Sequence, residues 1–203
     1  MASTLIGVGR RLTWDDFKEQ QPPPEAPHAA AGAFMTRSVA GGAPKKIQHP
    51  GASAPIYFLA DDITIRIELG DKTFRSPAVA KMAAGAKAEL LAHEQGHYDL
   101  YALVLRDWFY ELTTLTGRSY DDQAALVRLL STLKASYLDR IGEIQQIYDS
   151  DTEHNFNSAE QKTWLRAIRR ARKLKRQPIV EGKNGKPLER RLFDVLKEME
   201  LLV

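Results

Sequence analysis

The sequence predicts an α+β protein in which a small N-terminal β-sheet packs on a bundle of long helices that carries an HExxH, zincin-like site. Two patterns predict this fold class. Apolar and polar residues alternate over residues 63–69, as in a strand with one buried face, and after residue 76 the apolar residues recur at helical spacing. The 203 residues suffice for the core of one domain. We therefore expect a single domain over 1–203, with a β-rich part (about 1–72), a helical part (about 76–176) and a C-terminal arm (about 177–203).

The β-rich part is expected to open with a short helix. Thr13 and Asp16 have the spacing of a capping box, so residues 13–20 should form a short helix before a proline-rich loop. Residues 29–40 are expected to form a strand.

The clearest strand pattern lies over residues 63–69. Its alternating apolar residues are Ile63, Ile65, Ile67 and Leu69. Residues 55–60 just before it are also rich in strand-forming side chains. We expect these two segments to pair as a hairpin that turns at Asp61 and Asp62.

Three long helices are expected in the second part of the chain. Ser76 and the proline after it are a favourable N-cap and first-turn pair. The helix that they open should run to about Leu115 and could be interrupted at Gly85. A second amphipathic helix is predicted over about 121–149 and a third over about 158–176. A last amphipathic helix is predicted in the tail.

Composition limits the classes of function. With 29 basic and 26 acidic residues the formal charge is +3, which argues against nucleic-acid binding by the whole molecule. The absence of cysteine rules out disulfides, thiolate metal sites and a cysteine nucleophile. No stretch approaches transmembrane length and the N-terminus lacks the pattern of a secretory signal. We expect a soluble protein, cytoplasmic or else exported after removal of a signal peptide or by another route.

The stretch LLAHEQGHYDL, residues 90–100, is the strongest candidate for chemistry. Within a helix, His93 and His97 lie four residues apart and offer two imidazoles to one metal ion, while Glu94 beside them can act as a base. Gly96 lowers helix propensity by about 1 kcal/mol relative to alanine. Its presence predicts that another group approaches the backbone closely at this point.

Two imidazoles do not complete a catalytic zinc site, which usually has three protein ligands and an open position. Asp99 should point away from His97, because two residues turn a helix by about 200°. Tyr101 lies on the correct face and could offer a phenol, although it could equally be a packed residue. Further candidates follow the second long helix: Asp149, Asp151, Glu153 and His154. His154 is the most economical third ligand, whereas its alternative role is to interact with the helix dipole.

A basic run covers the end of the third predicted helix. Its members are Arg166, Arg169, Arg170, Arg172, Lys173, Lys175 and Arg176. Four of them share one helix face and could contact phosphates or an acidic partner. The usual explanation of such a run is a solvated helix face.

Three blocks of the chain, RLTWDDFK, HEQGHYD and YDSDTEH followed by Gln161 and Trp164, resemble a bacterial family of proposed zinc-dependent proteases that is catalogued as a domain of unknown function. The resemblance spans about residues 11–170. It implies that His93, His97 and His154 bind the metal ion and that Glu94 is the catalytic glutamate. Asn155 departs from the family pattern, which usually has glycine there; asparagine tolerates a left-handed backbone, so the turn can survive. Many family members are exported.

The expected function is therefore that of a zinc metallopeptidase with Zn²⁺ as cofactor and a protein or peptide as substrate. Glu94 would act as general base. Asp99 and Asp149 are candidates for orienting the imidazoles or for metal ligation, and Tyr101 or Tyr148 for stabilising the oxyanion. The alternative is a non-catalytic binding or assembly module with a structural or vestigial metal site and a basic helix that meets an acidic partner or nucleic acid.

Overall fold

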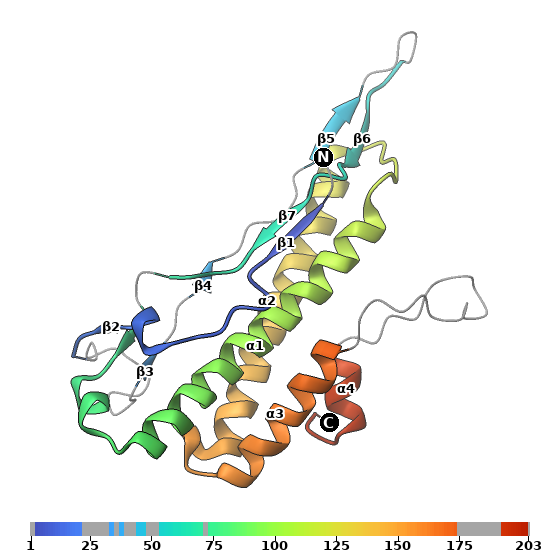
Figure 1. Cartoon of the computed structure of the whole chain (residues 1–203). Helices are drawn as coiled ribbons and strands as arrows, with labels where there is room; N and C mark the ends of the chain where they lie inside the picture. The colour runs from blue at the N-terminus through green and yellow to red at the C-terminus, as the bar shows by residue number, and fades with distance from the viewer. Residues whose placement is uncertain are drawn as a thin grey trace.

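The computed structural model describes residues 3–21, 33–34, 37–38, 44–47, 53–70, 73–173 and 192–202. It confirms the α+β fold class: long helices form a bundle, and short strands lie along one side of it (Figure 1). Within the described part of the chain we find no helix with the length and apolar character needed to cross a membrane.

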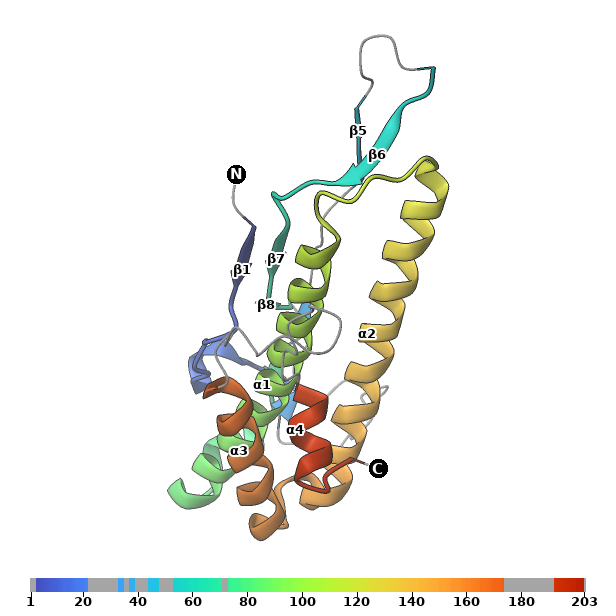
Figure 2. The same ribbon diagram turned by 90° about the vertical axis from the view of Figure 1, so that its right-hand side faces the viewer.

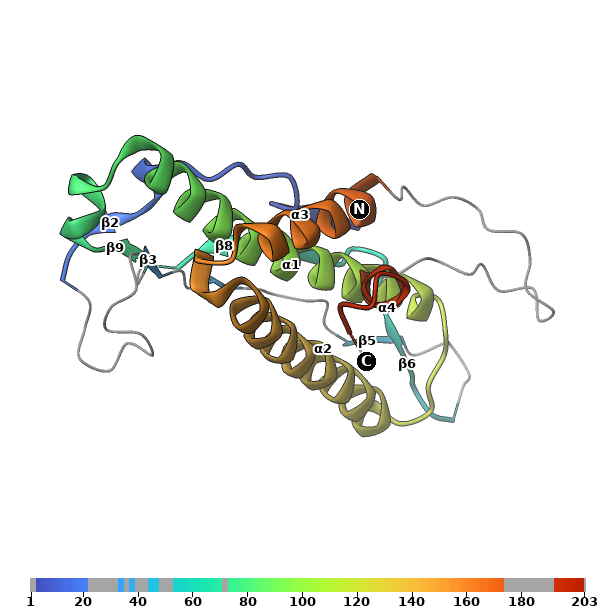
Figure 3. The ribbon, with the colours of Figure 1, turned by 90° about the horizontal axis from the view of Figure 1, so that it is seen from below.

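Helix α1 (Ala84–Leu115) is the central element of the bundle. Every residue from 98 to 109 is buried, so this part of the helix is covered all round. Helix α2 (Gln123–Thr152) runs back along α1, and helices α3 (Ser158–Lys173) and α4 (Leu192–Glu198) cover another side of it (Figures 1 and 3). The HExxH residues therefore lie on the helix that all the others contact.

The helix limits follow the capping signals in the sequence. The Ser76 hydroxyl accepts a hydrogen bond from Ala78 N at 3.2 Å, which confirms the predicted N-cap. It caps only a short 3-10 helix, η2 (Pro77–Lys81), and the chain is extended at Met82. The interruption thus precedes Gly85, which lies inside α1. At the next helix the Asp122 carboxylate caps α2 by accepting from Ala124 N at 2.8 Å.

The β-rich part consists of several small sheets. Its strands are β1 (Thr4–Ile6), β2 (Lys18–Glu19), β3 (Ala33–Phe34), β4 (Arg37–Ser38), β5 (Pro44–Ile47), β6 (Ile56–Leu59), β7 (Thr64–Arg66), β8 (Glu68–Leu69) and β9 (Phe74–Arg75). They pair as β1-β7, β2-β9-β3, β4-β8 and β5-β6. Figure 2 shows β1 and β7 alongside α1, with β5 and β6 extending beyond the end of the bundle. Ile63, Ile65 and Ile67 are buried in the core, as the alternation predicts.

The predicted hairpin between residues 55–60 and 63–69 is wrong. Strand β6 pairs antiparallel with β5, whereas β7 pairs in parallel with β1, in the register Leu5↔Ile65. The N-terminal strand thus occupies the edge that a hairpin partner would need. A parallel partner some 60 residues away leaves no turn signal in the sequence, so local patterns could not reveal it.

The short helix predicted for residues 13–20 is one turn long. Thr13 N donates to the Asp16 carboxylate at 2.7 Å, which confirms the capping box, and the 3-10 helix η1 covers only Trp14–Asp16. Phe17 is then extended and buried, and the chain continues as β2, which pairs with β9. Burial of Phe17 and sheet pairing outweigh the weak helical preference of this segment.

The described residues of the C-terminal arm belong to the core. Leu192, Val195 and Leu196 of α4 are fully buried. The Asp107 carboxylate of α1 accepts a hydrogen bond from Leu192 N at 2.7 Å, and Arg106 donates to Ala171 O at 2.9 Å. Neighbouring residues of α1 thus hold the end of α3 and the start of α4.

Candidate metal centre

Two elements bring three potential metal ligands together. His93 and His97 lie one turn apart on α1, and Asp149 lies on α2, three residues before its end. The Nε2 atoms of the two histidines are 3.1 Å apart. Asp149 Oδ1 lies 3.2 Å from His93 Nε2 and 2.9 Å from His97 Nε2. Three donor atoms from two helices therefore form a nearly equilateral triangle.

Hydrogen bonds on the far side of each imidazole fix which nitrogen carries the proton. Gln145 Nε2 donates to His97 O at 3.0 Å, so its Oε1 is left to accept from His97 Nδ1. The Thr152 hydroxyl donates to Tyr148 O at 2.6 Å, so its oxygen faces His93 Nδ1 as an acceptor, at 3.4 Å. In the neutral rings, Nδ1 then bears the hydrogen and Nε2 bears the lone pair.

Three electron-rich atoms thus face one another, an arrangement that is repulsive without a positive charge between them. Burial would raise the pKa of Asp149, but when Nε2 of His93 and His97 carries a proton, the hydrogen bonds donated by these rings outweigh burial and hold the pKa of this carboxyl well below its usual range. The charge in the centre is either a proton or a metal ion. Tetrahedral zinc with ligand distances near 2.0–2.1 Å separates its ligand atoms by about 3.3 Å. The observed triangle is close to that size, so these residues fit zinc.

The centre opens toward solvent on one side. The His93 side chain is 4% exposed and that of His97 12%, whereas that of Asp149 is 26% exposed. Asp149 therefore lies on the side of the centre nearest to solvent. Three protein ligands would leave one position of a tetrahedral zinc ion for water, which is the arrangement of catalytic zinc sites.

Glu94 follows His93 on α1 and lies next to this centre. Its side chain is buried, at 6% exposure. Among the described residues it has no hydrogen-bond or ion-pair partner. A carboxylate with no partner in the protein is free to accept a hydrogen bond from substrate or water.

His154 stands at the rim of the centre. Its Nδ1 is 3.5 Å from Asp149 Oδ1, and half of its side chain is exposed. His154 does not belong to the group formed by His93, His97 and Asp149, whose ligand atoms all lie within 4.8 Å of one another. The turn that carries it is left-handed, with φ of 48° at Glu153, 52° at His154 and 88° at Asn155. Asn155 thus adopts the left-handed backbone that asparagine was expected to tolerate.

Tyr148 closes the inner wall of the centre. Its ring stacks on His93 with centroids 4.9 Å apart and meets His97 edge to face, also at 4.9 Å. The hydroxyl donates to His93 O at 3.3 Å. Burial raises the pKa of Tyr148 far above its usual range, an effect that Glu94 reinforces. Tyr148 is fully buried and bonded to backbone, so it positions the imidazole instead of facing a substrate oxyanion.

Gly96 is required by this tyrosine. A Cβ at position 96 would lie 2.2 Å from the Tyr148 hydroxyl, closer than any real contact. The close approach predicted from the sequence is thereby confirmed. By contrast, a Cβ at Gly142 on α2 would have nothing within 4 Å.

We expect Gly96→Ala to lower the free energy of unfolding by about 2 kcal/mol, because the overlap outweighs the better helix propensity of alanine. Gly142→Ala is the matched control and should raise it by about 0.5–1 kcal/mol. Urea unfolding of both variants measures the difference. Adding Tyr148→Phe to Gly96→Ala should recover part of the loss, and a Gly96→Ala protein as stable as the parent would contradict the contact.

Asp99 and Tyr101, also predicted for the site, contact other parts of the molecule. Asp99 Oδ1 accepts from Gln95 Nε2 at 2.7 Å and pairs with Arg172 of α3. Burial raises the pKa of Asp99 to about 6, although Arg172 and Gln95 oppose the shift. Tyr101 lies in the hydrophobic core of the bundle. Asp99 therefore serves to join α1 to α3, and the triangle of donors does not include it.

Sequence reasoning missed Gln145, Thr152 and Gln95. Gln145 precedes Asp149 by one helical turn, so its position on the ligand face of α2 could have been noticed. Thr152 stands three residues after Asp149, also near that face. Gln95 accepts from Leu12 N at 2.7 Å and donates to Arg10 O at 3.1 Å, which attaches the N-terminal segment to the HExxH helix.

Comparisons of the chain with protein-family models, with curated proteins and with solved structures find no match. The resemblance to the bacterial protease family therefore stays a prediction. The function has to be argued from the residues of the centre.

Proposed function

We propose that the chain is a zinc-dependent metallopeptidase whose metal ion is held by His93, His97 and Asp149. The observation that supports this most is the convergence of two Nε2 lone pairs and one carboxylate oxygen within 2.9–3.2 Å of one another. Their far-side partners favour the neutral, metal-binding tautomer of both histidines. A site built from imidazole and carboxylate suits zinc and, less selectively, other transition metals.

Zinc in this centre would polarise the scissile carbonyl and lower the pKa of water to about 7. Glu94 would accept the proton of the attacking water and pass it to the amine nitrogen as the peptide bond breaks. Glu94 follows the ligand His93 directly on α1, which places its carboxylate beside the proposed metal site. Tyr148 and Gln145 would hold the imidazoles in place during the reaction. Peptide hydrolysis is the reaction that this set of groups supports best.

The test is to measure zinc by elemental analysis and cleavage of an unfolded protein on the same purified sample. We expect about one zinc per chain, loss of cleavage after chelation and its return on adding zinc. Stoichiometric zinc without cleavage would refute the peptidase and leave a structural or vestigial site. If neither the isolated nor the zinc-reconstituted protein retained metal, the centre itself would be refuted.

A further inference from the structure

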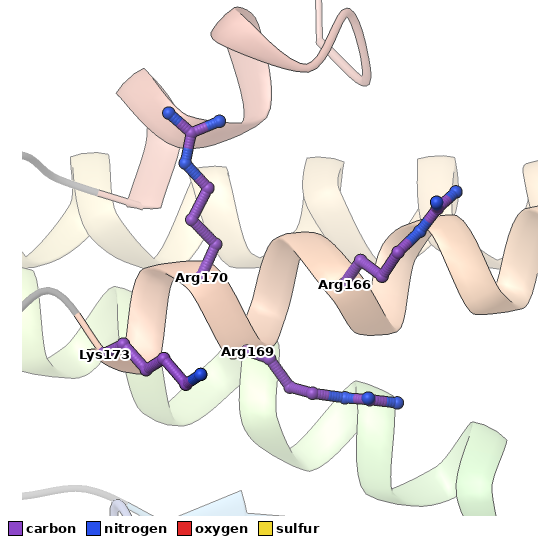
Figure 4. Close-up of a pocket in the computed structure, with 4 residues that line it drawn as sticks. All are labelled: Arg166, Arg169, Arg170 and Lys173. Carbon is purple, nitrogen blue, oxygen red and sulfur yellow. The ribbon is translucent and has the colours of Figure 1, made fainter.

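The outer face of α3 carries four cationic side chains around one hollow of about 390 Å³. They are Arg166, Arg169, Arg170 and Lys173, and all are exposed (Figure 4). Their spacing of i, i+3, i+4 and i+7 places them along one stripe of the helix. The opposite face of α3 is fixed in the core by Trp164, Ala167, Ile168 and Ala171. The stripe is thus presented on a rigid support.

Within the described part of the chain, this stripe is poorly neutralised. Arg170 pairs with Glu198 of α4 at 2.5 Å, and Arg166 donates to the neutral Thr163 hydroxyl at 3.0 Å. Arg169 and Lys173 form no ion pair with described residues. Like charges at i, i+4 repel one another, and the helix dipole favours cations only in the last turn. A bound polyanion would relieve this repulsion.

The location of the stripe links it to the metal centre. Helix α3 begins at Ser158, four residues after His154, and Trp164 Nε1 donates to Asp151 at the end of α2 at 2.9 Å. With a rise of about 1.5 Å per residue, the stripe lies about 12–22 Å along α3 from its start. The Trp164 ring also meets the Tyr148 ring edge to face, with centroids 5.4 Å apart. The helix that carries the stripe therefore packs against the wall of the centre, and the stripe lies on its outer face.

We propose that this face of α3 binds an acidic stretch of the polypeptide substrate, at a distance from the bond that is cleaved. The inference rests on the proposed peptidase function. The Arg170–Glu198 pair shows that the stripe accepts a carboxylate. A nucleic acid fits less well, because the chain has 26 acidic residues and a charge of only +3, and because the aromatic ring of α3, Trp164, is fully buried and cannot stack on bases.

The test uses two fluorescent peptides that differ only in six consecutive residues, Asp and Glu in one and Ser and Asn in the other. Binding is measured by fluorescence anisotropy with the Glu94→Gln protein, and cleavage is measured with the wild type. We expect the acidic peptide to bind about tenfold more tightly at low salt, with the difference reduced in 0.5 M NaCl. The double variant Arg169→Glu/Lys173→Glu should abolish the preference.

Arg118→Glu/Lys134→Glu makes the same change of charge at exposed residues outside the hollow and should keep the preference. Equal binding of both peptides, or equal loss of the preference in both double variants, would overturn the inference. The peptidase proposal would still stand if the wild type cleaves the peptides. Selective binding without cleavage by the zinc-loaded wild type would refute the peptidase and leave a surface for acidic polypeptides. Tighter binding of duplex DNA than of the acidic peptide would overturn the assignment of the partner.

Discussion

Replacing Glu94 by Gln should reduce peptide hydrolysis by about 10³-fold while leaving zinc content and thermal stability near those of the wild type. General base catalysis contributes on the order of 10²–10⁴ to rate, and the amide of glutamine cannot accept the proton. Glu94 has no hydrogen-bond or ion-pair partner among the described residues, so the isosteric amide breaks no contact and should keep the fold.

The measurement is kcat and KM on one peptide, together with zinc analysis of the same samples. A fall confined to kcat identifies a group that acts in the transition state, whereas a rise in KM alone would indicate substrate binding. Glu89→Gln, one turn earlier on the exposed part of α1, is the control and should leave kcat unchanged. Full activity in purified Glu94→Gln would remove this residue as the base.

The sequence predicted the part of the site that lies within one helix. His93, Glu94 and His97 are placed by α-helical periodicity alone, and the helix itself is signalled by an apolar pattern about 30 residues long. The close contact at Gly96 could also be predicted, because glycine inside a helix lowers helix propensity. The contact is made by the Tyr148 hydroxyl. Helical periodicity and helix propensity were therefore enough to predict the positions of these residues.

The sequence favoured His154 as the third ligand and kept Asp149 only as an alternative, because the position of α2 against α1 depends on tertiary register. Asp149 reaches the histidines only because α2 returns along α1 with the right offset, which no local pattern encodes. The parallel pairing of β1 with β7 escaped prediction for the same reason. The capping signals at Thr13 and Ser76 were confirmed, whereas the hairpin turn at Asp61 and Asp62 was wrong and pairing between distant segments required the structure.

The remaining residues of the three sequence blocks act as connections between elements. Gln95 holds the backbone of Arg10 and Leu12, Trp164 donates to Asp151, and Gln161 Nε2 donates to Glu89 O at 3.2 Å. The bonds of Gln95 join the N-terminal segment to α1, and the other two join α3 to α2 and to α1. These contacts give Gln95, Gln161 and Trp164 a structural role that does not depend on any family resemblance.

Asp149→Asn should weaken zinc binding by at least about 100-fold, whereas His154→Ala should change it only a few-fold. Asp149 Oδ1 lies at 2.9–3.2 Å from both Nε2 atoms, and replacing it with an amide removes both the charge and a strong oxygen donor. His154 is half exposed and sits beside Asp149 outside the triangle. Competition with a zinc-binding dye measures both affinities.

The pair of variants also separates the two classes of function. If only Asp149→Asn loses zinc, the wild-type ion is held by three protein ligands and keeps one open position, as catalysis requires. Loss in His154→Ala alone would instead support the ligand set implied by the family resemblance and would refute Asp149. Equal loss in both would mean four protein ligands and a closed site, which is the form of structural zinc. In that case no water could bind the metal for Glu94 to activate, and the peptidase proposal would be refuted.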